Sequence, residues 1–152
     1  TNSYDRAEVL RLLDGIIDLY LPDLKYWDSE LGRKYSRVFD YGEVSRAAIK
    51  EMHRQVGSDL LVGRDGTARH GLVIRHLVMP NDIAGTERCL RWVAEELSPT
   101  VTVNLMAQYR PAHRAARYPD LSRRVSQGEY ARAVSVAKQT GLKNVLVDSW
   151  ML

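Results

Sequence analysis

A chain of 152 residues with 45% apolar and 27% charged residues has the size and composition of one ordinary globular domain. It contains no apolar run near the roughly 18 residues of a membrane helix, and no signal peptide is visible, so we expect no membrane span. The net charge of +3 is too small to indicate nucleic-acid binding, and the single cysteine, Cys89, excludes an internal disulfide and fits a cytoplasmic protein.

Hydrophobic periodicity divides the chain into alternating helical and extended segments. In chain order we expect a helix over residues 4–14, a strand over 16–21, helices over 28–38 and 40–56, a hairpin or loop over 59–70, a strand over 71–79, a helix over 81–97, a strand over 101–107, a helix over 126–140 and a strand over 144–147. Two helix starts have capping-box spacing, Asp40 with Glu43 and Ser126 with Glu129.

Four strands separated by helices predict an α/β fold with a parallel sheet and right-handed crossovers. Either half of a βα barrel or a small open sheet satisfies this pattern. No glycine-rich phosphate loop of the dinucleotide or nucleoside-triphosphate type follows a strand. The cysteine, histidine and serine residues likewise lack the sequence spacing typical of a zinc site or of a hydrolase active site.

The strand at 71–79 carries Arg75 and His76 within an otherwise apolar run. An unpaired buried arginine costs roughly several kcal/mol, so Arg75 must meet an anion, either Asp18 or Asp23 or a bound ligand. Because neighbouring residues of a strand face opposite sides, only one of the two can face a barrel interior. We predict that this residue is Arg75, and that His76 forms a hydrogen bond under a covering helix.

Ligands of parallel α/β folds bind at the carboxyl ends of the strands. The first three strands bring polar and charged side chains to that edge. These are Asp23 and Lys25 after the first strand, Arg75 in the second, and Gln108, Tyr109 and Arg110 after the third.

Three segments, in order and in spacing, resemble the carboxyl-terminal part of radical S-adenosylmethionine proteins, in particular pyruvate formate-lyase activating enzyme and its relatives. They are DLYLPDLKY at 18–26, AAIKEMHRQVG at 47–57 and GLVIRHLVMP at 71–80, and the likeness continues through QYRP at 108–111 and YP at 118–119.

The resemblance implies a TIM-like partial βα barrel that binds S-adenosylmethionine against a four-iron four-sulfur cluster. One-electron reduction then gives a 5′-deoxyadenosyl radical, which abstracts hydrogen from a glycine of a partner protein, with a flavodoxin or ferredoxin as electron donor. It also implies roles for individual residues. Asp23, Lys25, Arg75, Gln108 and Tyr109 would bind the cofactor, and Arg75 and Arg110 would bind substrate.

The chain departs from the family in lacking the CxxxCxxC cluster motif and the glycine-rich segment, and in having Tyr109-Arg110 where activating enzymes have Tyr-His. It also begins at Thr1 rather than Met, which we interpret as a cut or processed chain. We therefore expect residues 1–152 to be a single inactive fragment of a longer enzyme. Cys89 occupies a helical apolar position typical of a buried structural thiol.

Two other functions fit parts of the sequence. A noncatalytic binding module could use the basic segment 110–124 for RNA or an acidic partner, with affinity that falls with salt. An ordinary βα-barrel lyase or isomerase could use Lys25 as its base, which requires a lysine deep in a pocket.

Overall fold

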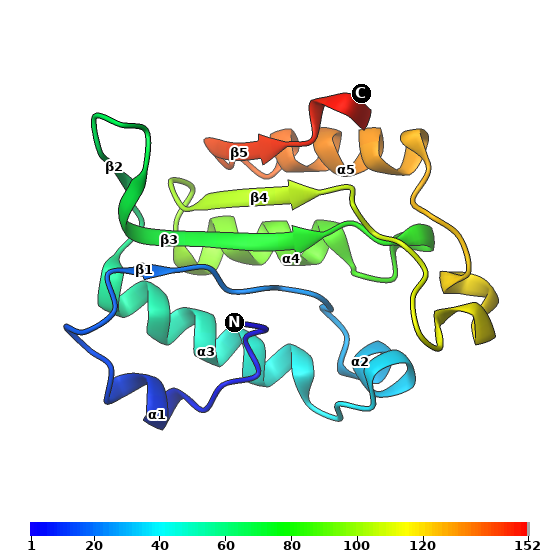
Figure 1. The fold of residues 1–152 in the computed structure, drawn as a ribbon, viewed down its shortest axis with the longest axis horizontal. Coiled ribbons are helices and arrows are strands. Elements are labelled where there is room, and N and C mark those ends of the chain that lie inside the picture. The colour runs from blue at the N-terminus through cyan, green and yellow to red at the C-terminus, as the bar shows by residue number, and fades with distance from the viewer. Residues whose placement is uncertain (152) are drawn as a thin grey trace.

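The computed structural model describes residues 1–151, which form an α/β fold (Figure 1). The helices are α1 (Ala7–Arg11), α2 (Ser29–Ser36), α3 (Tyr41–Val56), α4 (Thr86–Trp92) and α5 (Gln127–Gln139). The strands are β1 (Leu19–Tyr20), β2 (Leu61–Val62), β3 (Ala68–Leu77), β4 (Thr102–Met106) and β5 (Asn144–Val147). Short helical turns cover Pro80–Asp82, Val93–Leu97, Ala115–Arg117, Pro119–Leu121 and Ser149–Met151.

The sheet is mostly parallel, as the sequence predicts. Its main strands lie in the order β1-β3-β4-β5, and each pairs in parallel with its neighbour. The short strand β2 pairs antiparallel with the start of β3, which confirms the expected hairpin. β3 is therefore the central strand that contacts β1, β2 and β4.

The helices pack against one face of this sheet. Figure 1 shows β3 and β4 in front of α4. Strand residues on the covered face share one core with residues from α3, α4 and α5; its largest fully buried members include Ile49, Met52, Leu72, Ile74, Leu90, Val103, Leu105 and Tyr130. Alternate residues point to the other face, where Arg75 is half-buried and Leu146 is 52% exposed. The sheet thus has one helix-covered face and one largely uncovered face.

A second, smaller core lies beyond the carboxyl end of β3. It joins the segment after β1, the start of α3 and the turns that follow β3 and β4, through Tyr26, Tyr41, Met79, Ile83, Ala84 and Leu121. The rings of Tyr26 and Tyr41 meet edge to face, with centroids 5.7 Å apart. This core supports the edge of the sheet where parallel folds place their ligands.

Two expected elements are shorter than their apolar patterns indicate. The first helix covers only Ala7–Arg11, and the first strand only Leu19–Tyr20. Ile16, which the pattern places in the strand, is 66% exposed and follows a turn in which Gly15 has φ of +76°. The apolar run at 16–21 therefore begins as a turn and joins the sheet only at its end.

The helix expected at 81–97 begins later, at Thr86. Asn81 and Asp82 have left-handed backbone conformations, with φ of 57° and 51°, so they form a turn instead of the helix start. The Asp82 carboxylate accepts a hydrogen bond from the Thr86 backbone N–H at 2.9 Å, which satisfies one of the free donors of α4.

One of the two expected capping boxes forms. Ser126 and Glu129 make both reciprocal hydrogen bonds at the start of α5. The expected box at Asp40 is wrong, because the Asp40 carboxylate accepts a hydrogen bond from the Tyr4 hydroxyl and makes no side-chain cap.

The change from hairpin to parallel strand depends on Gly71, which has φ of +124°. A Cβ atom at this position would lie 2.6 Å from the Asp59 carbonyl oxygen. Glycine is therefore required where β3 passes beneath the segment that leads into β2. None of the helices formed by residues 1–151 has both the length and the apolar character needed to span a lipid bilayer.

Candidate functional site

Three charged side chains meet on the uncovered face of the sheet, at the carboxyl end of β1. Asp23 bridges in parallel to Arg75 just beyond β1. The Arg75 Nη2 atom lies 2.6 Å from Asp23 Oδ1, and the Lys25 Nζ atom lies 3.3 Å from Asp23 Oδ2. The anion that Arg75 was expected to meet is thus Asp23, not Asp18. We call Asp23, Lys25 and Arg75 the charged triad.

The triad has more positive than negative charge, because one carboxylate serves two cations. Asp23 is largely buried at 16% exposure, whereas Arg75 and Lys25 are 38% and 37% exposed. Its hydrogen bonding is incomplete: Arg75 Nε is buried and meets no acceptor within residues 1–151. Asp23 Oδ1 is close to Arg75 but is not aligned for a hydrogen bond. The partly exposed guanidinium of Arg75 beside the Lys25 ammonium is suited to binding a carboxylate.

Asn104 is a neighbour of the triad that the sequence reasoning missed. It pairs in register with Arg75 across β3 and β4, so its half-buried amide lies on the same face. Had the expected strands at 71–79 and 101–107 been aligned in register, Asn104 would have been visible as a polar residue beside Arg75.

His76 points to the opposite face, as predicted. It is fully buried, and its Nδ1 and Nε2 atoms lie 2.8 Å from the Leu24 carbonyl oxygen and 3.0 Å from the Thr86 hydroxyl. A carbonyl oxygen can only accept, so Nδ1 carries the proton and Nε2 accepts from Thr86. Burial lowers the pKa of His76 to about 4, which keeps the imidazole neutral.

The residues after β4 lie beside the triad's edge of the sheet, but no hydrogen bond or ion pair within residues 1–151 joins them to it. Gln108 and Arg110 are exposed. The Tyr109 hydroxyl donates to the Leu121 carbonyl oxygen at 2.8 Å, and burial raises the pKa of this phenol. Tyr109 and Arg110 instead line a cavity of about 230 Å³. Its other aromatic walls are Tyr26, Tyr35 and Tyr118.

The basic segment 110–124 is partly neutralised by its surroundings. Arg123 donates to both carboxylate oxygens of Glu129, at 2.7 and 2.8 Å. Asp120, the acidic residue of the segment, accepts from Lys34 and Tyr35. The other arginines of the segment are exposed, at positions 110, 114, 117 and 124.

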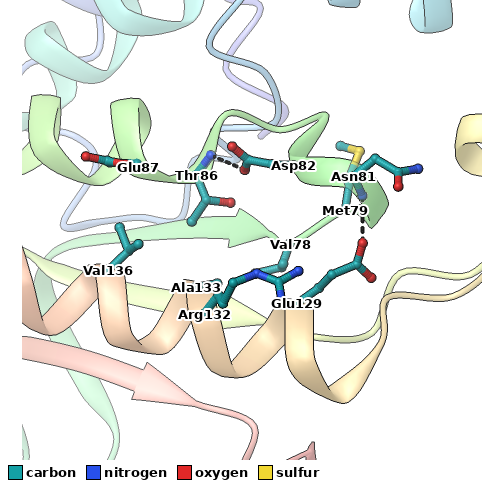
Figure 2. A pocket seen from close by; sticks show the side chains of 10 residues that line it. All are labelled: Val78, Met79, Asn81, Asp82, Thr86, Glu87, Glu129, Arg132, Ala133 and Val136. Atoms are coloured by element: carbon teal, nitrogen blue, oxygen red, sulfur yellow. Dashed lines mark hydrogen bonds between the residues drawn. The ribbon is translucent and has the colours of Figure 1, made fainter.

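A larger cavity, of about 330 Å³, lies between α4 and α5 and is separate from the triad (Figure 2). Two of its carboxylates already serve as caps: Glu129 accepts from the Asn81 backbone N–H at 2.8 Å, and Asp82 accepts from that of Thr86. These acidic groups thus stabilise the turn and the two helix starts.

Residues 1–151 contain no cluster of three histidine, cysteine or acidic side chains that could hold a metal ion. Cys89 is fully buried in α4, and its Sγ atom lies 3.6 Å from the Ala84 carbonyl oxygen. Burial raises the pKa of this thiol to about 12, so it stays protonated. This confirms Cys89 as a buried structural thiol.

Comparison with known proteins gives one informative relative. The chain is 34% identical over 143 residues to an uncharacterized protein of the archaeon Methanocaldococcus jannaschii. The match covers 93% of this chain but only 38% of the archaeal protein. No family model and no solved structure matches.

Proposed function

We propose that this chain is the carboxyl-terminal part of a radical S-adenosylmethionine protein and that the charged triad binds the cofactor. One observation carries the proposal: a triad with excess positive charge and two partly exposed cations lies at the carboxyl ends of parallel strands, on the uncovered face of the sheet. Ligands of parallel α/β folds bind at that edge.

The donors and acceptors of the triad match the amino-acid end of S-adenosylmethionine. Arg75 and Lys25 would bind its carboxylate, and Asp23 would accept from its ammonium group or ribose hydroxyls. When bound, the cofactor supplies a sulfonium whose one-electron reduction yields the 5′-deoxyadenosyl radical. Gln108 and Tyr109 would complete the cofactor site and Arg110 would meet the substrate, a glycine of a partner protein by analogy with the activating enzymes.

The iron–sulfur cluster has no ligands in the part of the chain that the structure describes. Cluster ligation requires thiolates, and Cys89 is a buried, protonated thiol. In this proposal the cluster cysteines and the contact with an electron donor lie outside these residues.

The shape of the sheet supports a partial barrel. The main strands β1, β3, β4 and β5 lie in the sheet in the same order as along the chain, and the helices cover one face only. Parallel sheets normally have both faces covered, and a barrel satisfies this by closing its inner face on itself. The chain spans 38% of the length of its archaeal relative, which leaves ample sequence for further strands there.

The test uses the whole protein that contains this chain, reconstituted anaerobically with iron and sulfide and supplied with dithionite. We expect 5′-deoxyadenosine to form from S-adenosylmethionine, and to fall sharply with Lys25→Ala. The matched control is Lys50→Ala, which removes an exposed lysine paired with Glu96 on the helix side. A cluster-loaded protein that forms no 5′-deoxyadenosine refutes the proposal.

A noncatalytic binding module is the second candidate. It is favoured by the exposed Arg110 and Arg114 at the rim of the tyrosine-lined cavity, since stacking rings beside cations are typical of single-stranded RNA sites. Affinity for a short RNA that falls steeply with salt would support it. The lyase or isomerase reading is not favoured, because Lys25 is half-exposed and paired with Asp23 instead of buried alone.

A further inference from the structure

The backbone that presents Asp23 and Lys25 has a strand partner on one side only. β1 ends at Tyr20, and beyond Pro22 the chain continues along β3. The Leu24 N–H donates to the Arg75 carbonyl oxygen at 2.9 Å, and the Arg75 N–H donates to Pro22 at 2.8 Å. On the other side, the Asp23 N–H donates to the Thr1 carbonyl oxygen at 3.0 Å, and the remaining polar groups of residues 23–25 need side-chain partners.

Tyr41, at the first turn of α3, supplies a side-chain hydrogen-bond partner for this backbone segment. Its hydroxyl accepts from the Lys25 N–H at 3.2 Å and lies 2.9 Å from the Asp23 carbonyl oxygen, to which it can donate. The same hydroxyl lies 2.9 Å from the Asn2 carbonyl oxygen, and its single hydrogen serves one of the two carbonyls at a time. Tyr41 is 4% exposed, so this phenol cannot readily exchange these partners for water.

His76 provides a further partner, from the helix-covered face. Its Nδ1–H donates to the Leu24 carbonyl oxygen, and its Nε2 is fixed by Thr86. Two buried side chains, one from α3 and one from β3, thus bond the backbone of three consecutive residues. Without them, residues 23–25 would keep only the backbone hydrogen bonds to Arg75 and Thr1.

From this geometry we infer that Tyr41 and His76 are positioning residues for the charged triad. In an extended segment, residues two apart share a face, so the backbone of residues 23–25 must keep one orientation for Asp23 and Lys25 to point together toward Arg75. Tyr41 and His76 fix that orientation and touch no ligand themselves. The consequence for cofactor affinity rests on the proposed function; the effect on the backbone does not.

The closing experiment compares Tyr41→Phe with Tyr26→Phe in the 152-residue chain. Both variants remove only a hydroxyl, and the two rings are equally buried, at 4% and 6% exposure. The Tyr26 hydroxyl bonds Ser36 and forms no hydrogen bond with residues 23–25, which makes it a matched control. Amide hydrogen exchange at Lys25 is measured by NMR relative to Val103 in the core, so that local opening is separated from global unfolding.

We expect Tyr41→Phe to raise the relative exchange rate at Lys25 by about fivefold or more, because the amide loses its acceptor. In the whole cluster-loaded protein, it should also weaken binding of S-adenosylmethionine by about fivefold. For His76, the Asn variant keeps an N–H donor and should retain wild-type affinity, whereas His76→Leu should not. Tyr26→Phe should leave both measurements within about twofold of wild type, because its hydroxyl bonds Ser36 and not the backbone of residues 23–25.

Equal exchange at Lys25 in the two tyrosine variants would overturn the inference, whatever the cofactor result. A cluster-loaded whole protein of wild-type sequence that does not bind S-adenosylmethionine would count against the proposed function, and the exchange measurement would still decide the role of Tyr41. Unchanged affinity in Tyr41→Phe together with binding in the wild type would overturn the inference and leave the proposed function standing.

Discussion

The buried His76 predicts a loss of stability at mildly acidic pH. Its pKa is lowered from 6.5 to about 4 by burial, which outweighs the hydrogen bond to Leu24 and the nearby charge of Asp82 that favour the protonated form. Between these two values the unfolded chain binds a proton that the folded chain does not, so stability falls as the pH drops from 6.5 towards 4. Over the whole pH range of this titration the free energy of unfolding falls by about 3 kcal/mol. About 2 kcal/mol of that is lost between pH 7 and pH 5.

Urea unfolding of wild type and His76→Asn at pH 7, 6 and 5 tests this. The wild type should lose about 2 kcal/mol more than the variant between pH 7 and pH 5. His53, whose pKa burial also lowers, contributes equally to both proteins and cancels in the difference. Glu51, whose pKa Arg54 and Gln55 lower to about 2, affects stability mainly below pH 5. Parallel loss of stability in the two proteins would refute the assignment of a neutral buried imidazole.

Three further substitutions test the site and the fold. Lys25→Ala should weaken S-adenosylmethionine binding about tenfold and leave the thermal midpoint unchanged, because a half-exposed ion pair stabilises little; unchanged affinity would exclude Lys25 from the site. Arg75→Leu should destabilise the chain by about 1–2 kcal/mol because Asp23 loses its nearer cation, so a raised melting temperature would contradict the anion argument. Glu129→Gln should cost about 2 kcal/mol in urea unfolding, since its largely buried carboxylate caps α5 and also binds Asn81 and Arg123. The control Glu87→Gln, at an exposed position, should stay near wild type. An equal loss of unfolding free energy in Glu129→Gln and Glu87→Gln would refute the capping role of Glu129.

Strand parity allowed much of the site to be predicted. Alternation along 71–79 placed Arg75 and His76 on opposite faces, and the carboxyl-end rule brought Asp23 and Lys25 to Arg75. These rules depend only on local geometry and on a parallel sheet. They hold although the first strand is much shorter than its apolar run indicates.

The features that sequence reasoning missed depend on contacts between distant segments. Tyr41 meets Lys25 across 16 positions of sequence, and no periodicity distinguishes its hydroxyl from that of any other buried tyrosine. The Asp40 carboxylate forms no cap and instead accepts a hydrogen bond from Tyr4, 36 positions away. Gln108, Tyr109 and Arg110 remain predictions, since the turns after β4 direct Tyr109 to Leu121 and not to the triad.

The order of the strands also bears on how the chain is made. Because β3, β4 and β5 each dock beside the strand completed just before, a growing polypeptide can add one strand and its helix at a time to an edge that is already formed. No later segment has to insert between two earlier neighbours among these three strands. Synthesis from the amino end and assembly of the sheet can therefore proceed in the same direction, and the edge at the newest strand stays open to unwanted pairing only until the next strand docks.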